Sequence, residues 1–145
     1  YPVNLWTTDP QSLELVPWQL IDENGLLVAF PTDMILACGE KLLLIKNQTA
    51  FISEFGPLPT GVQWLEWGSA KLSNGGEKIE LQMPGEKDTV THERYYIRID
   101  RVNYNDEDPW PTTPDGDGQS LSRIDPSAYG NDNINWQPAN PTPGW

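Results

Sequence analysis

Five acidic residues late in the chain have the type and spacing that could do chemistry: Asp106, Glu107, Asp108, Asp115 and Asp117. Calcium takes about six to eight oxygen ligands from carboxylates and loop carbonyls, so a loop folding back on itself could build a calcium site from these acids. Against this, the 115–118 turn lacks the third acid and the closing glutamate of an EF-hand loop, and solvated turn carboxylates are the competing interpretation. Calcium is therefore a candidate cofactor, and no other cofactor is expected.

A catalytic nucleophile with its base is not evident. His92 is the single histidine and lies in a polar stretch, with no neighbour that would orient it as a base. Cys38 is the single cysteine, so no internal disulfide can form, and its apolar neighbours predict a buried thiol. A Cys38–His92 pair or a pair of glycosidase carboxylates has no specific pattern behind it. We therefore expect that the protein is not an enzyme.

Two other patterns could mark surface sites. Residues 47–49, Asn-Gln-Thr, match the acceptor for N-glycosylation, which matters only in a secreted eukaryotic chain. Trp64 and Trp67 are expected in opposite phases of a strand, so one of them could lie on the surface and contact a sugar or a protein. Packing of both indoles in the core is the competing interpretation.

The acidic residues flank a stretch that earlier parts of the chain must hold in place. Residues 108–123 contain three prolines and two glycines, which forbid a helix, so Trp110 must be fixed by turns against strands. We expect this stretch to act as a lid, with Arg123 as its anchor because no other basic residue follows Arg101. The residues expected to have structural roles are Trp110, Ser120, Leu121, Arg123 and Trp136.

Length and charge limit the classes of protein and partner. A chain of 145 residues fits one domain, here residues 1–145 with 106–145 as an irregular lid, expected to be excised from a larger protein. The net charge is −12, and no basic groove is evident, so nucleic acid is not an expected partner, whereas a cation or a cationic partner is. No apolar stretch approaches the ~18 residues of a membrane span.

Short apolar segments separated by turn residues predict an all-β fold. We expect an immunoglobulin-like antiparallel β-sandwich of about seven to nine strands, followed by a long irregular segment rich in proline and glycine. Asn24-Gly25 predicts a hairpin turn, because both residues readily take positive φ. The apolar run Leu42–Ile45 predicts a central strand, and residues 47–55 have the spacing of a short helical turn.

The second half of the chain contains the longest alternating patterns. Residues 78–83 place Ile79, Leu81 and Met83 on one inward face, and the polar residues 86–93 predict a loop or an extension of the hairpin. A bulge near Asp100-Arg101 is expected, because it would keep two sets of apolar residues in opposite phases on the same inward face. These sets are Tyr95, Ile97 and Ile99, then Val102 and Tyr104.

An ordered set of segments resembles the lamin-tail domain family. The segments are residues 72–81, 99–104, 109–111, 115–123, 135–136 and 142–144, and residues 3–6, 18–22, 30–31 and 39–43 resemble that family's early strands. The resemblance implies an immunoglobulin-like sandwich without a catalytic constellation, most similar to the bacterial branch. The strand that usually precedes residues 3–6 is missing and the 86–94 loop is longer than usual. The resemblance therefore implies an open sheet edge that could pair with an upstream segment or another copy.

Three functions follow from these observations as hypotheses. The first is a non-catalytic binding or positioning module of a larger secreted or cell-surface bacterial protein, with a protein or an extracellular polymer as partner. The second is an accessory domain that targets an extracellular hydrolase or nuclease to a carbohydrate or other polymer. The third is a lamin tail with a scaffold and protein-interaction role. The expected location is extracellular or on the cell surface.

Overall fold

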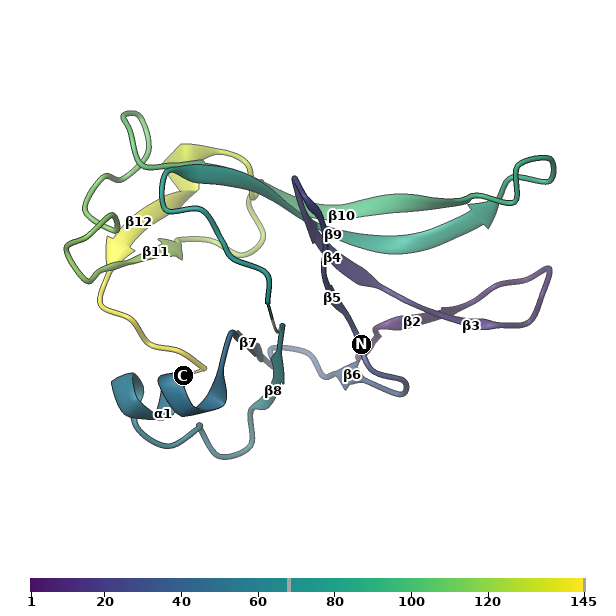
Figure 1. Ribbon diagram of the computed structural model, residues 1–145, viewed down its shortest axis with the longest axis horizontal. Helices are drawn as coiled ribbons and strands as arrows, with labels where there is room; N and C mark the ends of the chain where they lie inside the picture. The colour runs from purple at the N-terminus through teal and green to yellow at the C-terminus, as the bar shows by residue number, and fades with distance from the viewer. Residues whose placement is uncertain (68, 145) are drawn as a thin grey trace.

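The largest element of the fold is a four-stranded antiparallel sheet with strand order β10-β9-β4-β5. The computed structural model describes residues 1–67 and 69–144, so Trp145, the end of the predicted lid, lies outside the described residues. The sheet contains β4 (Gln19–Asp22), β5 (Gly25–Ala29), β9 (Gly76–Lys87) and β10 (Arg94–Asn105). The β9–β10 hairpin runs along the length of the molecule, and β4 and β5 descend from its middle (Figure 1).

Four two-stranded pairs surround this sheet. Three are antiparallel: β1 (Val3–Asn4) with β6 (Ile35–Leu36), β2 (Trp6–Thr8) with β3 (Leu15–Pro17), and β11 (Ser120–Arg123) with β12 (Trp136–Ala139). The fourth, β7 (Leu42–Ile45) with β8 (Gln63–Glu66), is parallel. A parallel pair needs a long crossover connection, and the helix α1 (Gln48–Phe55) lies within it. A 3₁₀ turn, η1 (Asn133–Asn135), precedes β12.

The expected all-β class is confirmed in its coarse form, a mostly β protein with several small antiparallel sheets. Strands contain 41% of the residues, and the described part of the chain has one short α-helix. Leu42–Ile45 is a strand as predicted, but the prediction that it is central is wrong, because β8 is its single partner among the described residues. The predicted helical turn is confirmed as α1, which begins after the N-cap Asn47 and ends at Gly56.

The core lies where the main sheet meets the N-terminal segments. Leu5, Leu27, Val28 and Phe30 are buried, and half-buried side chains from β4, β7, β8 and β9 pack against them. Among those predicted to face inward on β9, Ile79 and Leu81 join this cluster, whereas Met83 lies outside it. The core is therefore concentrated around the middle of the β9–β10 hairpin.

The predicted bulge in β10 is confirmed, but its predicted consequence is wrong at one end of the strand. The register with β9 shifts between Arg98 and Asp100. Tyr95, Ile97 and Ile99 nevertheless remain 61%, 50% and 46% exposed. β4 pairs with β9 only over Glu80–Gln82, so this end of the hairpin extends beyond the four-stranded part of the sheet, and the three side chains lie outside the hydrophobic core.

The structure corrects two other predictions, one about a hairpin turn and one about the burial of Cys38. The hairpin at Asn24-Gly25 forms, but Asp22 pairs with Gly25, so its two central residues are Glu23 and Asn24. The prediction that Cys38 is buried is wrong. Cys38 lies in a turn after β6, beside Gly39 with a φ of 78°, and its thiol is exposed.

The loops of the β2–β3 and β9–β10 hairpins have the same construction. In each, an aspartate begins the loop, and its Oδ1 accepts hydrogen bonds from two backbone amides: Gln11 and Ser12 for Asp9, Val90 and Thr91 for Asp88. In each, the fifth residue has a left-handed φ, 61° at Leu13 and 60° at His92. The sequences Asp-Pro-Gln-Ser-Leu-Glu and Asp-Thr-Val-Thr-His-Glu share the Asp-x-x-Ser/Thr-x-Glu pattern. Of the region 86–93, residues 86–87 extend β9 and residues 88–93 form the loop, so each of the two alternatives holds for part of it.

Candidate functional site

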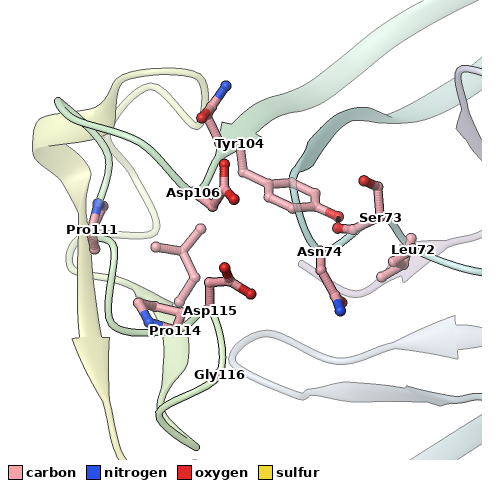
Figure 2. Close-up of a pocket in the computed structure, with 11 residues that line it drawn as sticks. Leu72, Ser73, Asn74, Tyr104, Asp106, Pro111, Pro114, Asp115 and Gly116 are labelled. Atoms are coloured by element: carbon pink, nitrogen blue, oxygen red, sulfur yellow. Dashed lines mark hydrogen bonds between the residues drawn. The ribbon is translucent and has the colours of Figure 1, made fainter.

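A cavity of about 330 Å³ lies where the chain after β10 folds back toward the turn before β9 (Figure 2). Its walls come from that turn, from the end of β10, from the lid and from β11. The lining residues are Leu72, Ser73, Asn74, Tyr104, Asn105, Asp106, Pro111, Pro114, Asp115, Gly116 and Leu121. Cavities that hold small ligands begin at about this size, so one side chain or a small molecule would fill it.

Tyr104 is the aromatic wall of the cavity, and hydrogen bonds from its hydroxyl fix its position. Its hydroxyl lies 2.5 Å from the Ser73 carbonyl oxygen and 3.3 Å from Oε1 of Glu77. Burial raises the pKa of the Tyr104 hydroxyl above its ordinary value, and the nearby negative charge of Glu77 raises the pKa further. The hydroxyl therefore stays protonated and acts as a donor, while the ring faces the space between Ser73 and Asp106 (Figure 2).

The buried carboxylate of Glu77 also holds the turn that forms the opposite wall. Its side chain is 6% exposed and accepts a hydrogen bond from the Ser73 amide at 2.8 Å. The turn then passes through Gly76, which has a φ of 115° and pairs with Asn105 at the end of β10. A Cβ atom at Gly76 would lie 2.9 Å from the Asn105 Cα. Only glycine therefore allows the two strands to approach at this point.

The structure brings two of the five predicted metal ligands to the cavity. Asp106 and Asp115 line it, whereas Glu107, Asp108 and Asp117 are exposed and do not. Within residues 1–67 and 69–144, no three histidine, cysteine, aspartate or glutamate side chains are arranged to hold a metal ion. The geometry thus gives calcium no set of ligands, and the calcium site stays a prediction.

Arg123 contacts two other segments of the chain. Its guanidinium donates to Oδ2 of Asp100 on β10 and to the Ala128 carbonyl oxygen, each at 2.5 Å. Gly130 fits against the same group, since a Cβ there would lie 2.5 Å from Oδ1 of Asp100 and 3.2 Å from Nη2 of Arg123. These contacts tie the segment after β11 to the main sheet.

The other predicted structural residues lie in the same part of the chain. The rings of Trp110 and Trp136 are 6.4 Å apart and tilted by 45°, and Nε1 of Trp136 donates to the Gly130 carbonyl oxygen at 2.8 Å. Ser120 donates to the Ala139 carbonyl oxygen at 3.1 Å, and Leu121 lines the cavity. The segment predicted to be a lid thus contains the β11–β12 pair and forms one side of the cavity.

Sequence reasoning missed the residues on the other side of the cavity. The sequence patterns place Ser73 and Asn74 only within the segment 72–81 that resembles the lamin-tail family, and Tyr104 only among the apolar residues of a strand. One signal was available, namely a glycine pair directly before an alternating strand, which is typical of a close approach between backbones. Nothing in the sequence indicates that this turn meets the lid, since that depends on packing between segments about forty residues apart.

The remaining candidate residues lie away from the cavity. His92 is exposed in the β9–β10 loop, as expected for a solvated histidine. Asn47 is an exposed helix cap, and its side chain accepts a hydrogen bond from the Ala50 amide. Trp64 is 38% exposed, whereas Trp67 is half-buried and packs against the core. The interpretation that places one of the two indoles at the surface therefore agrees with the structure.

The cavity has the chemistry of a site for a positively charged group. Two aspartates, two asparagines and an aromatic ring line it, together with apolar surface from leucine and proline side chains. The described part of the chain contributes no lysine, arginine or histidine to the lining. Neither Asp106 nor Asp115 takes part in an ion pair among the described residues.

Fold and cavity together define a mostly β protein with a small acidic cavity. Comparison with protein-family models, curated proteins and solved structures finds no match to this chain. The lamin-tail resemblance therefore stays a prediction. No helix in the described residues is long and apolar enough to span a membrane.

Proposed function

We propose that this chain is a non-catalytic binding or positioning domain whose cavity receives a cationic group from a protein or polymer partner. The observation that carries the proposal is that the Tyr104 ring and the carboxylates of Asp106 and Asp115 line the same cavity, to which residues 1–67 and 69–144 contribute no basic side chain. A lysine or arginine side chain, or another alkyl ammonium group, has the matching charge.

The shape and composition of the cavity favour a cation carried on an apolar stem. The charged end would lie near the two carboxylates, and the stem would contact Leu72, Leu121 and the proline rings. An aromatic wall adds cation–π attraction of about 0.5–1 kcal/mol at a partly exposed site. The net charge of −12 would also attract a cationic partner over a longer range.

The finer architecture and the setting of the domain belong to the same proposal. In it, the main sheet and the smaller pairs form two layers of an immunoglobulin-like sandwich, with residues 106–145 as the lid. The resemblance to the lamin-tail family is the reason we expect this domain within a larger secreted or cell-surface protein. The non-catalytic assignment is supported by the composition of the cavity, which contains an acid pair and a tyrosine but no nucleophile held by a base.

Ligand titration followed by NMR tests the proposed site. N-acetyl-lysine methylamide should shift the backbone amides of residues 72–76 and 104–106, whereas the neutral analogue N-acetyl-norleucine methylamide should bind more weakly. The double variant Asp106→Asn/Asp115→Asn should weaken lysine binding roughly five- to thirtyfold, taking about 0.5–1 kcal/mol for each partly screened charge.

A matched control separates the site from general electrostatic attraction. Glu107→Gln/Asp117→Asn removes the same amount of charge from nearby acids that do not line the cavity. This control should retain nearly full affinity. Equal weakening in both double variants, or equal binding of the neutral analogue, would show that the cavity does not select a cation.

A further inference from the structure

The outer edge of β10 is covered along one half and open along the other. Near its C-terminal end, Nη2 of Arg101 donates to the Tyr129 hydroxyl at 3.0 Å, and the Asn103 amide donates to Oδ1 of Asn131 at 2.6 Å. Residues 94–100 pair with β9 on one side, and within the described chain no strand pairs with their other side. An unpaired edge of this kind offers backbone donors and acceptors to another strand.

The sequence of this open edge is complementary to itself in the antiparallel direction. With a two-fold axis through Ile97, Arg94 would lie opposite Asp100 of a second copy, Tyr95 opposite Ile99, and Tyr96 opposite Arg98. Arg94 and Asp100 already form ion pairs with Asp9 and Arg123 of the same chain, so the pairs that would stabilise the neighbouring strands are the aromatic with the β-branched side chain and the aromatic ring with the guanidinium. We propose that two copies of this chain associate through residues 94–100 of β10, forming a continuous eight-stranded sheet.

The same arrangement accounts for the exposed apolar side chains of β10. Tyr95, Ile97 and Ile99 are about half exposed or more in the single chain. Ile97 pairs with Met83 in the β9–β10 register, so it belongs to the sheet face that carries Leu81 and Ile79. Pairing across the axis would bring the corresponding side chains of two copies together on one face of the joined sheet, and each would lose exposure to water.

Local charge favours this edge over the rest of the surface. The chain as a whole carries −12, so two copies repel each other wherever their acidic surfaces meet. The open edge contains Arg94 and Arg98, whose charges are offset by Asp9 at 2.9 Å and by Glu80 at 3.8 Å. Here the repulsion is small.

The bulges of the hairpin set how much of the edge can pair. Register shifts lie between Arg94 and Tyr96 and between Arg98 and Asp100, so regular pairing is centred on residues 96–98. Bulges and charged residues are features that limit pairing at sheet edges. The association should therefore be a weak, reversible dimer, independent of the cavity described above.

Sedimentation equilibrium and a matched pair of variants test the dimer. The 16.3 kDa chain should show a doubled mass as its concentration rises toward about 1 mM, the upper end of measurable weak complexes. Ile97→Lys places two like charges on the axis and should weaken dimerisation at least tenfold. Ile134→Lys makes the same substitution at a residue that is 76% exposed elsewhere and should leave the dimer unchanged.

Cysteine cross-linking tests the register directly, in a Cys38→Ser background because Cys38 is exposed. Opposed residues of antiparallel strands have Cα atoms about 4.5–5.5 Å apart, within disulfide range. Ile97→Cys chains should therefore cross-link with themselves. Tyr95→Cys and Ile99→Cys chains should cross-link when mixed but not alone, since like positions would lie roughly 14 Å apart.

Two results would overturn the proposal. One is a single-chain mass at every concentration together with no cross-linking of Ile97→Cys chains. The other is a dimer that forms but cross-links Tyr95→Cys or Ile99→Cys chains with themselves as readily as it cross-links the mixture. The cross-linking also covers the case in which Ile97→Lys fails to fold.

Discussion

Substituting alanine for Gly76 would test whether the close approach of β9 and β10 builds the cavity. Gly76 has a φ of 115°, a conformation that L-residues rarely adopt, and its Cβ would lie 2.9 Å from the Asn105 Cα and closer still to the Tyr104 carbonyl oxygen. The strained backbone costs about 1–2 kcal/mol, and displacing the end of β10 loses about one ladder hydrogen bond, worth roughly 0.5–1.5 kcal/mol. We therefore expect Gly76→Ala to lower the free energy of unfolding by about 1.5–3.5 kcal/mol.

Gly75→Ala is the matched control for this substitution. A Cβ at Gly75 would have its nearest neighbour, Oγ of Ser73, at 3.9 Å, and Gly75 has no positive φ. This change should leave stability unaltered or raise it by up to about 1 kcal/mol, because alanine reduces the entropy of the unfolded chain. Equilibrium unfolding in urea measures both variants, with an unchanged m-value as the sign of an unchanged folded state.

The two glycine variants should also differ in ligand binding. Gly76→Ala should move the Tyr104 ring and weaken binding of N-acetyl-lysine methylamide, whereas Gly75→Ala should bind it normally. Equal unfolding free energies for the two variants, within about 0.5 kcal/mol, would refute the inference that Gly76 fixes the strands that carry Tyr104.

Three further predictions concern the lid, the hairpin loops and calcium. Arg123→Lys removes the guanidinium that bonds both Asp100 and the Ala128 carbonyl oxygen, and should lower the free energy of unfolding in urea by about 1–3 kcal/mol. As a control, Arg98→Lys changes only an exposed contact with Glu80 at 3.8 Å and should lower it by less than about 0.5 kcal/mol. A hydrogen bond from the Gln11 amide, and after it the contact with Arg94, lowers the pKa of the Asp9 carboxyl below its usual 3.8. The ionised carboxylate therefore stabilises the fold above pH 3.8, and this stabilisation is lost as the pH falls through the lower pKa of the folded state. The free energy of unfolding, measured from pH 6 to 2, should therefore depend less on pH in Asp9→Asn than in the wild type. Calcium at 1 mM should shift the Tm by less than about 1 °C relative to chelator at equal ionic strength, because no ligand set is formed, and a larger shift would support the predicted site.

Local patterns predicted the secondary structure well because short-range physics determines it. The hairpin at residue 25, the strand at Leu42–Ile45, the helix after Asn47 and the bulge after Arg98 all follow from turn chemistry, capping and the phase of apolar residues. The partners of each strand could not be read in the same way. Leu42–Ile45 has the composition of a central strand, yet it joins one neighbour in a parallel pair, because its place depends on the crossover through α1.

Burial was the least predictable property. Cys38 has apolar neighbours in sequence but lies in a turn, and Ile97 is in phase with inward residues but projects beyond β4. The sequence indicates Asp106 and Asp115 as candidate calcium ligands but predicts neither the cavity that they line nor the turn at Ser73 on its other side. Sequence phase gives the face on which a side chain lies, but whether another layer covers that face is decided by contacts between distant segments.

The matched loops of the two long hairpins have a consequence for the order in which the chain assembles. Each loop closes with hydrogen bonds among six neighbouring residues, so it can form without any distant partner, on the microsecond scale of isolated hairpins, about 1–10 μs. Pairing of β4 with β9 brings together Gln19 and Gln82, which are 63 residues apart, so it loses more chain entropy than closing either loop does. Folding should therefore begin at the two hairpin loops and finish with the lid, which can pack onto the sheet only after β9 and β10 have paired.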